Sequence, residues 1–300
     1  MENFGARLPY VLMTAAHNEG RHLERTINCV LNQTVRPLRW VIISDNSSDE
    51  TDEIIQRYAG DHEFIRFSRL NRAAGRNFAC KVIALKSGSH LLAGAHFELI
   101  GNLDADIILE PDYFERLVEL FAKHQDLGVA GGFVYEDFDG KFRSRKHNNV
   151  ESVPHAAQLV RRACYEAIGG YAVLEFGGED WHAQISAAMR GWTARAFPEL
   201  KIFHLRHTGS GGNVLRHSFR QGLMDYSFGS YPLFEVVKCL RRLTSAYCGG
   251  LIRMSGFTWG YLSRRKRPVS DEFIAFLRKE QKQRLLGRVQ SSSDPELNAT

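Results

Sequence analysis

With 300 residues, 44% of them hydrophobic and 24% charged, the chain has the composition of a globular protein that can bury a full core, and this excludes a disulfide-stapled scaffold. The net charge of +5 is uneven, because residues 201–300 carry 17 Lys/Arg and 7 Asp/Glu, a net +10 that leaves −5 for residues 1–200. A basic tail beside an acidic body indicates an anionic partner for the tail, either a lipid surface or nucleic acid.

The first half of the chain alternates short apolar runs with segments whose apolar residues recur at helical spacing. The expected strands cover 10–13, 40–43, 64–67 and 97–103, and the expected helices cover 20–31, 48–58, 73–86 and 111–121. Such alternation predicts an α/β fold with a mostly parallel, Rossmann-like sheet and helices on both faces.

The second half of the chain is less regular. We expect a strand over 129–138 and short helices over 162–168 and 180–190, whereas the polar, basic residues 141–149 indicate a mobile loop. From about Ser210 onward the pattern changes to amphipathic helices. This change predicts a boundary between a domain over 1–209 and a basic helical extension over 210–300.

The sequence contains no recognisable targeting or membrane-spanning segment. Residues 1–8 lack the apolar run of a signal peptide, and no apolar stretch is long enough to cross a bilayer. The five cysteines are widely separated and form no Cys-x-x-Cys pair, which argues against a zinc or thioredoxin-type site. We therefore expect reduced thiols and a cytoplasmic protein.

Polar side chains follow three of the predicted strands at the point where each ends: Asn18 and Glu19, Asp45, and Asp104. In parallel sheets, ligands bind beyond the carboxyl ends of the strands. These side chains should therefore converge on one crevice.

Asp104 and Asp106 directly follow the apolar run 97–103. Two neighbouring carboxylates repel each other unless a cation lies between them, and hard oxygen ligands suit Mg²⁺ or Mn²⁺. Such an ion would neutralise a departing diphosphate. The alternative is a pair of aspartates that caps a loop.

Two further residues indicate nucleotide binding. Asp45 ends a strand, where a carboxylate can accept the imide N–H of a uracil or contact a ribose hydroxyl. Arg76 lies on the following helix and could meet a phosphate or a base, although a solvated helix arginine explains it equally well.

Glu179 and Asp180 follow Gly177-Gly178 and open a helix, whose dipole would keep a carboxylate ionised there. An ionised carboxylate at this place can act as general base for an acceptor hydroxyl, whereas an ordinary acidic helix cap is the plainer interpretation. His204 follows an apolar run and could complete a metal site, although a lone histidine is more often structural.

Together these motifs resemble those of the inverting, GT-A-fold family 2 glycosyltransferases, over about residues 10–207. The resembling segments are 15–19 (AAHNE), 30–34 (VLNQT), 44–49 (SDNSSD), 76–77 (RN), 104–106 (DAD), 168–171 (IGGY) and 178–180 (GED). In the third of these Ser44 and Asn46 depart from the family's Asp-Asp-Gly pattern, so only Asp45 is carried over. Order and spacing make the combination specific, although each motif alone is weak.

The resemblance implies a GT-A catalytic domain with a nucleotide-sugar half over about 1–107 and an acceptor half over about 108–209. It implies a nucleotide-diphosphate sugar as donor, a UDP-sugar preferred, with inversion, and Asp180 as general base. Metal ligands would be Asp104, Asp106 and His204, the last through a late His-x-Arg segment. The implied nucleotide-sugar contacts are Ala15, Asn18, Glu19, Asp45, Arg76, Asp104 and Glu179.

The tail resembles that of relatives that build polysaccharides, which implies a saccharide or lipid-linked acceptor at the inner face of the cell membrane. Residues 249–261 are apolar and aromatic, and Arg264-Arg265-Lys266-Arg267 follow them. This composition fits either an interfacial anchor on an anionic membrane surface or a helix packed on the protein with a solvated basic end.

Two other classes of function compete with transfer. A nucleotidyltransferase would normally bring a glycine-rich, basic phosphate loop, which residues 15–20 lack. A degenerate nucleotide-sugar-binding protein without turnover would not need Asp104, Asp106 and Asp180 intact. No nucleic-acid recognition module is present, so we expect no nucleic-acid partner.

Overall fold

The computed structural model describes residues 8–72, 78–146, 148–206, 214–241 and 249–287. The chain forms two compact units, Met1–Ser210 and Gly211–Thr300. All candidate site residues that the structure describes belong to the first unit.

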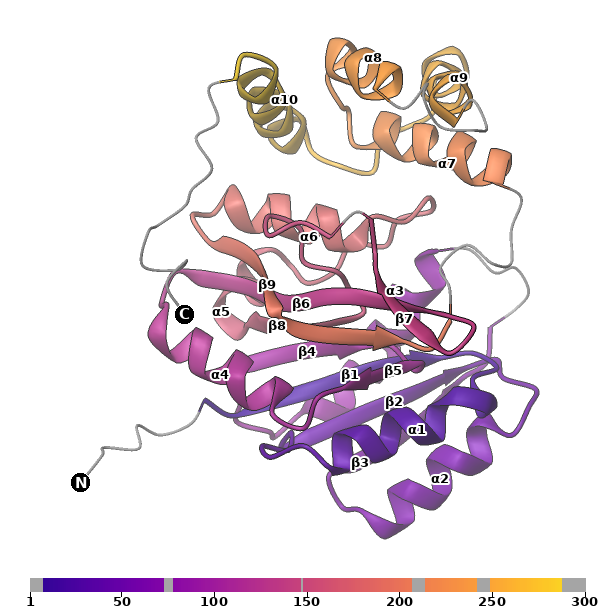
Figure 1. The fold of residues 1–300 in the computed structure, drawn as a ribbon, viewed down its shortest axis with the longest axis vertical. Coiled ribbons are helices and arrows are strands. Elements are labelled where there is room, and N and C mark those ends of the chain that lie inside the picture. Colours follow the sequence, from indigo (N-terminus) through magenta and orange to yellow (C-terminus); the bar gives the residue numbers. More distant parts are fainter. Residues whose placement is uncertain (1–7, 73–77, 147, 207–213, 242–248, 288–300) are drawn as a thin grey trace. The chain divides into compact units, whose positions relative to one another are not determined.

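The first unit is built on one sheet of nine strands among the described residues, flanked by helices (Figure 1). The strands are β1 Tyr10–Ala16, β2 Arg39–Asp45, β3 Ile65–Leu70, β4 Leu99–Leu103, β5 Ile107–Leu109, β6 Leu127–Phe138, β7 Lys141–Ser144, β8 Ala157–Arg161 and β9 Thr193–His204. The helices are α1 Gly20–Leu31, α2 Thr51–Asp61, α3 Ala79–Gly88, the 3₁₀ turn η1 Ser89–Leu92, α4 Tyr113–Lys123, α5 Arg162–Ala167 and α6 Glu179–Ala188.

The strand order is β3-β2-β1-β4-β8-β6-β9-β5, with β7 paired to β6. The four strands β3, β2, β1 and β4 are parallel, as βαβ connections require. Beyond β4 the directions mix: β8 runs antiparallel to β4 and β6, whereas β9 runs parallel to β6. The predicted α/β fold is thus confirmed, and its parallel part is the N-terminal half.

Alternation along the strands divides the core between the two faces of the sheet. Val11 and Met13 of β1 pack with α3, α5 and α6 in one cluster of buried residues. Tyr10 points to the other face, where its ring stacks on Phe114 of α4 at 5.1 Å between centroids. Strands buried on both faces need mostly apolar side chains, which explains the apolar runs in the sequence.

The stretch between α3 and β4 packs against β2. Leu92 of η1 is buried, and Arg39 Nη1 donates to the carbonyl oxygens of Leu91 and Ala93 at 2.8 and 2.9 Å. These contacts account for a segment whose length the sequence does not explain.

The expectation of a mobile loop over 141–149 is wrong for its first part. Residues Lys141–Ser144 form β7, which pairs antiparallel with β6 although all four side chains are exposed. Beyond β7, Arg145 Nε donates to Glu136 Oε1 at 2.9 Å, which ties the returning chain to β6. Backbone pairing does not require apolar side chains, so hydrophobic patterning missed this strand.

The second unit is a group of helices, α7 Val214–Ser227, α8 Pro232–Leu240, α9 Gly249–Leu262 and α10 Asp271–Leu285. Helices α7 and α9 approach closely at Gly222 and Gly256, where a Cβ atom would collide with the backbone of the opposite helix. Arg253 of α9 is buried and donates to Asp225 of α7 at 2.7 Å. Small residues and a buried ion pair therefore fix this crossing.

The structure corrects which tail residues are open to a partner. Phe257 is buried in the helical unit, and Arg267 lies over the ring of Tyr226 at 4.7 Å and donates to its carbonyl oxygen. By contrast, Leu251, Trp259 and Leu262 are exposed on one face of α9. None of the helices in the described ranges is both long and apolar enough to span a bilayer.

Candidate active site

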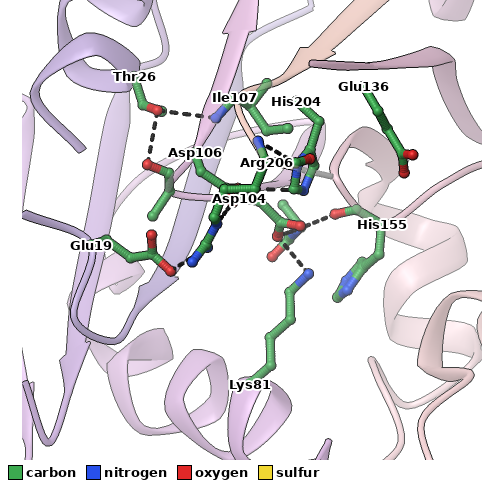
Figure 2. A network of polar contacts seen from close by, with 12 residues as sticks. Glu19, Thr26, Lys81, Asp104, Asp106, Ile107, Glu136, His155, His204 and Arg206 are labelled. Atoms are coloured by element: carbon green, nitrogen blue, oxygen red, sulfur yellow. Dashed lines mark hydrogen bonds and ion pairs between the residues drawn. The ribbon is translucent and has the colours of Figure 1, made fainter. Parts of the chain in front are cut away.

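The turn between β4 and β5 carries Asp104 and Asp106, and neighbouring elements fix its shape (Figure 2). Thr26 of α1 donates to the carbonyl oxygen of Ala105 at 2.9 Å and accepts from Ile107 N at 3.1 Å. On the β4 side, Asn102 Nδ2 donates to Asp104 Oδ1 at 3.2 Å. A buried threonine therefore fixes the backbone of the turn and an asparagine holds the Asp104 carboxylate, and the motif alone reveals neither contact.

Three side chains of this region could hold a metal ion. One ligand atom from each of Asp104, Asp106 and His204 lies within 4.8 Å of the others. His204 ends β9, whose pairing with β5 brings it opposite Ile107. Its Nδ1 lies 2.6 Å from the carbonyl oxygen of Arg206, which leaves Nε2 directed to Asp106, 3.5 Å from Oδ1. Two carboxylates and an imidazole are a donor set that fits Mg²⁺ or Mn²⁺.

Each of the two aspartates also has a cationic partner. Lys81 Nζ of α3 donates to Asp104 Oδ1 at 2.5 Å, and Arg206 Nε donates to Asp106 Oδ2 at 2.6 Å. Arg206 Nη2 also donates to Glu19 Oε1 at 2.6 Å, so one guanidinium joins two buried carboxylates. Burial opposes the charge of Lys81, but Asp104 and Glu179 raise its pKa, so it remains an ammonium ion.

Sequence reasoning missed Lys81 and assigned no role to Arg206. The signal for Lys81 was a single lysine within the apolar segment 79–85, where a buried charge requires an acidic partner. For Arg206 the signal was its place two residues after His204, on a strand end that leads into the crevice.

The second pair of acids opens α6. Gly177 and Gly178 adopt φ values of +87° and +85°, in the left-handed region that favours glycine, and so turn the chain into the helix. Asp180 Oδ1 accepts from Trp181 N at 2.7 Å. Glu179 Oε1 lies 3.4 Å from Nδ1 of His155, a buried histidine in the loop before β8.

The two neighbouring acids have opposite pKa shifts. Burial would raise the pKa of Glu179, but the contact with His155 and the charge of Lys81 outweigh it and hold the pKa at about 2. Burial, together with the negative charge of Glu179, raises the pKa of Asp180. The helix dipole alone would lower the pKa of Asp180, but desolvation and the neighbouring charge are larger effects and shift it upward.

The nucleotide-side residues are only partly brought together. Asn18, at φ +54°, accepts from Ser48 N at 2.8 Å and links the loops after β1 and β2. Asp45 accepts two hydrogen bonds from Arg72, at 2.7 and 2.8 Å. Ala15 lies near the end of β1, beside Ile43. Arg76 falls outside the described residues, and the contacts of all four with a nucleotide stay predictions.

Solved structures with the same fold contain nucleotide sugars. The chain aligns with the mannosyltransferase PcManGT from Pyrobaculum calidifontis, in complex with GDP-Man and Mn²⁺, at a TM-score of 0.56 and 13% identity over 96% of this chain and 89% of that one. It aligns with S. aureus TarS 1-349, in complex with UDP-GlcNAc, at 0.54 and 13% over 94% and 93%. These likenesses show that the chain has the GT-A fold of these glycosyltransferases.

The sequence profile of glycosyl transferase family 2 matches residues 12–177, more than half of the chain, and the protein belongs to this family. It is 33% identical over 126 residues to the chondroitin synthase of Escherichia coli, covering 41% of this chain and 17% of that protein. It is 32% identical over 120 residues to the poly-beta-1,6-N-acetyl-D-glucosamine synthase of Staphylococcus epidermidis, covering 40% and 27%. The matches thus span less than a third of these curated relatives.

Proposed function

We propose that this glycosyltransferase transfers a sugar, with inversion and with a bound divalent metal ion, from a nucleotide-diphosphate donor to a saccharide or lipid-linked acceptor. One observation carries the proposal. The ammonium of Lys81 pairs with Asp104 of the candidate metal cluster and also feels the charges of Glu179 and Asp180, so both acidic pairs lie near the same cation. A donor diphosphate and an acceptor hydroxyl can therefore meet within one polar crevice.

Asp104, Asp106 and His204 would hold the ion, which neutralises the leaving diphosphate when bound. Asp180 accepts the proton of the acceptor hydroxyl as its oxygen bonds to the anomeric carbon. The bond between that carbon and the phosphate oxygen breaks on the opposite face, which inverts the configuration. Glu179, ionised at neutral pH, keeps Lys81 and His155 in place beside the reacting groups.

The raised pKa of Asp180 suits this role. A general base works best when its pKa lies close to the working pH, because it then binds the transferred proton more firmly while still ionised. Burial and the Glu179 charge move Asp180 in that direction. The base is active above its pKa, so transfer should rise with pH through the titration of Asp180.

The proposed donor is a UDP-sugar, with Asp45 contacting the base. TarS binds UDP-GlcNAc and PcManGT binds GDP-Man, so the fold accommodates either nucleotide. The proposed acceptor is a growing saccharide, because the curated relatives are named as synthases of chondroitin and of poly-N-acetylglucosamine.

The deciding experiment is calorimetry with UDP-GlcNAc and with GDP-mannose, each with and without Mn²⁺, followed by measurement of donor hydrolysis. A catalyst of the proposed kind binds one donor with metal and hydrolyses it slowly. Metal-dependent binding without any hydrolysis or transfer would identify a binding protein instead. Binding that is unaffected by Mn²⁺ would contradict the metal site.

We also propose that the second unit contacts an anionic membrane from the cytoplasmic side. The supporting features are the exposed Leu251, Trp259 and Leu262 on α9 and the exposed Arg264, Arg265 and Lys266 after it. Basic residues near an anionic surface contribute about 1 kcal/mol each, so these three supply about 3 kcal/mol of salt-sensitive attraction. Buried Arg253 and stacked Arg267 serve the fold.

Liposome flotation tests this contact. Replacing Arg264, Arg265 and Lys266 by Ser should abolish binding to anionic liposomes, whereas Lys279→Ser on α10 should leave it intact. Equal binding of the wild-type chain to neutral and anionic liposomes would refute the proposal.

A further inference from the structure

His155 is a buried residue that the proposed reaction does not yet use. Its side chain is 5% exposed, and its Nε2 has no hydrogen-bond partner among the residues that the structure describes. Buried polar atoms are nearly always satisfied in native proteins, so such an atom beside a crevice indicates a missing ligand or water.

The backbone of His155 is fixed against the strand that carries the metal motif. Its carbonyl oxygen accepts a short hydrogen bond from Asn102 Nδ2, and Asp104 N donates to the carbonyl oxygen of Ala156 at 2.8 Å. Any movement of His155 would therefore disturb the Asp104 turn, so the histidine is held in register with the candidate metal cluster.

The ring itself is held from two sides. Its edge packs against Tyr171 at 4.3 Å between centroids and an interplanar angle of 69°. On the other side Nδ1 lies 3.4 Å from Glu179 Oε1. An ionised carboxylate at this place favours the hydrogen on Nδ1, which leaves Nε2 without a partner.

The surroundings of the ring belong to the transfer centre. Figure 2 shows the ring of His155 and the ammonium of Lys81 on the same side of Asp104. Glu179 and Asp180 complete this group, since the charges of His155 and Lys81 both lower the pKa of Asp180. A donor sugar and an acceptor end must come together between Asp104 and Asp180 if these residues act as proposed.

We propose that Nε2 of His155 binds a hydroxyl group of the sugar at the point of transfer, and that this contact selects which sugar is accepted. A hydroxyl can donate to a neutral Nε2 or accept from a protonated one, so it satisfies the ring in either state. Sites that hydrogen-bond a substrate hydroxyl discriminate strongly against sugars that lack it, because the buried partner is then left unpaired. This inference rests on the proposed function.

Three variants at this position separate the two nitrogens. An Asn amide reaches the place of Nδ1, a Gln amide reaches that of Nε2, and Phe keeps the ring packing on Tyr171 without either nitrogen. In the presence of Mn²⁺ we expect His155→Asn and His155→Phe to weaken sugar binding about tenfold, a cost of roughly 1.4 kcal/mol. His155→Gln should keep most of the wild-type affinity, and the exposed His90→Asn serves as matched control.

The probes distinguish donor from acceptor. If the hydroxyl belongs to the donor, His155→Asn weakens binding of UDP-GlcNAc but not of UDP. If it belongs to the acceptor, donor affinity is unchanged and the KM for an N-acetylglucosamine oligosaccharide rises. Both outcomes support the inference.

Two results would overturn it. The first is an unchanged donor affinity and acceptor KM in His155→Asn and His155→Phe. The second is an equal loss of sugar affinity in His155→Asn and His155→Gln that accompanies a lower melting temperature. That result would show that His155 serves only to pack the fold. A wild-type chain that binds no nucleotide sugar would instead refute the proposed function, and this inference with it.

Discussion

Two pairs of acidic residues belong to the candidate site, and their environments differ. In the first pair, Asp104 and Asp106 each have a cation of their own, Lys81 and Arg206. In the second pair, His155 and Lys81 hold Glu179 ionised, and Asp180 has a raised pKa. The two pairs consist of similar residues, but the charges around them differ, and so they suit different chemistry.

The charges around a carboxylate thus separate a role in metal binding from a role in proton transfer. A carboxylate surrounded by cations stays ionised and can exchange one cation for another, as a metal ligand must. A carboxylate desolvated beside a negative neighbour gains affinity for a proton, as a base must. The following predictions test this division of roles, from the largest expected effect to the smallest.

Asp180→Asn should reduce transfer by about 10²–10⁴-fold while donor affinity stays the same, because an amide cannot accept the proton. Turnover at saturating donor and calorimetry with UDP-GlcNAc and Mn²⁺ measure the two quantities. Asp61→Asn, at the exposed end of α2, is the control. A variant that loses donor binding but keeps turnover would reverse the roles of the two acid pairs.

Asp106→Asn should weaken metal-dependent donor binding by at least about 100-fold, since even residues that only support metal ligands account for 10–100-fold. The variant should stay folded, with a smaller effect on the free energy of unfolding than on donor binding, because Arg206 still pairs with Glu19. Calorimetry with and without Mn²⁺ is the measurement. Unchanged metal-dependent affinity would remove Asp106 from the metal site.

Glu179→Gln should act on pH dependence. The pKa of Glu179 is about 2, below its ordinary 4.5, so its ionised form stabilises the fold above pH 4.5, and that contribution is lost as the pH falls towards 2. We expect a loss of about 2 kcal/mol at pH 7, less than the roughly 3 kcal/mol that the shift implies, because Asp180 is relieved of a like charge.

The same variant should shift the acidic limb of the pH–rate profile to lower pH, since removing the Glu179 charge lowers the pKa of Asp180. Chemical denaturation at several pH values and a pH–rate profile check both effects. A limb that does not move would show that Asp180 is not the titrating base.

Lys81→Met should have the smallest effect. Without metal the melting temperature should fall, because Asp104 loses its ammonium partner. The affinity for Mn²⁺ should rise about fivefold, or roughly 1 kcal/mol, because no cation then competes for Asp104. Arg57→Gln, in an exposed ion pair with Glu24, should change neither quantity. A weaker affinity for Mn²⁺ in Lys81→Met would show that Lys81 supports the metal site rather than competing for it.

The N-terminal strands and the aspartates of the candidate metal cluster could be predicted from the amino-acid sequence. The segments that became β1, β2 and β4 are mostly apolar because both faces of these strands are buried, and buried polar side chains among them, such as Thr14 and Asn102, are hydrogen-bonded. Asp104 and Asp106 were recognisable since they follow such a run directly. His204 was a weaker candidate, raised by its place after an apolar run and by the family resemblance, and the pairing of β5 with β9 accounts for its proximity to the aspartates.

The surroundings of these residues depend on contacts that the tertiary fold creates. Exposed β7 is held by backbone pairing, which leaves no hydrophobic pattern to detect. The contacts of the site join residues that are far apart in the chain: Lys81 is 23 residues from Asp104, His155 is 53 residues from Asn102, and Arg206 is 100 residues from Asp106. The pKa of Asp180 depends on burial and on the charge of Glu179, and local helix position pointed in the opposite direction. The pKa of a carboxyl group depends on all the charges near it, and the fold brings these together from distant parts of the sequence.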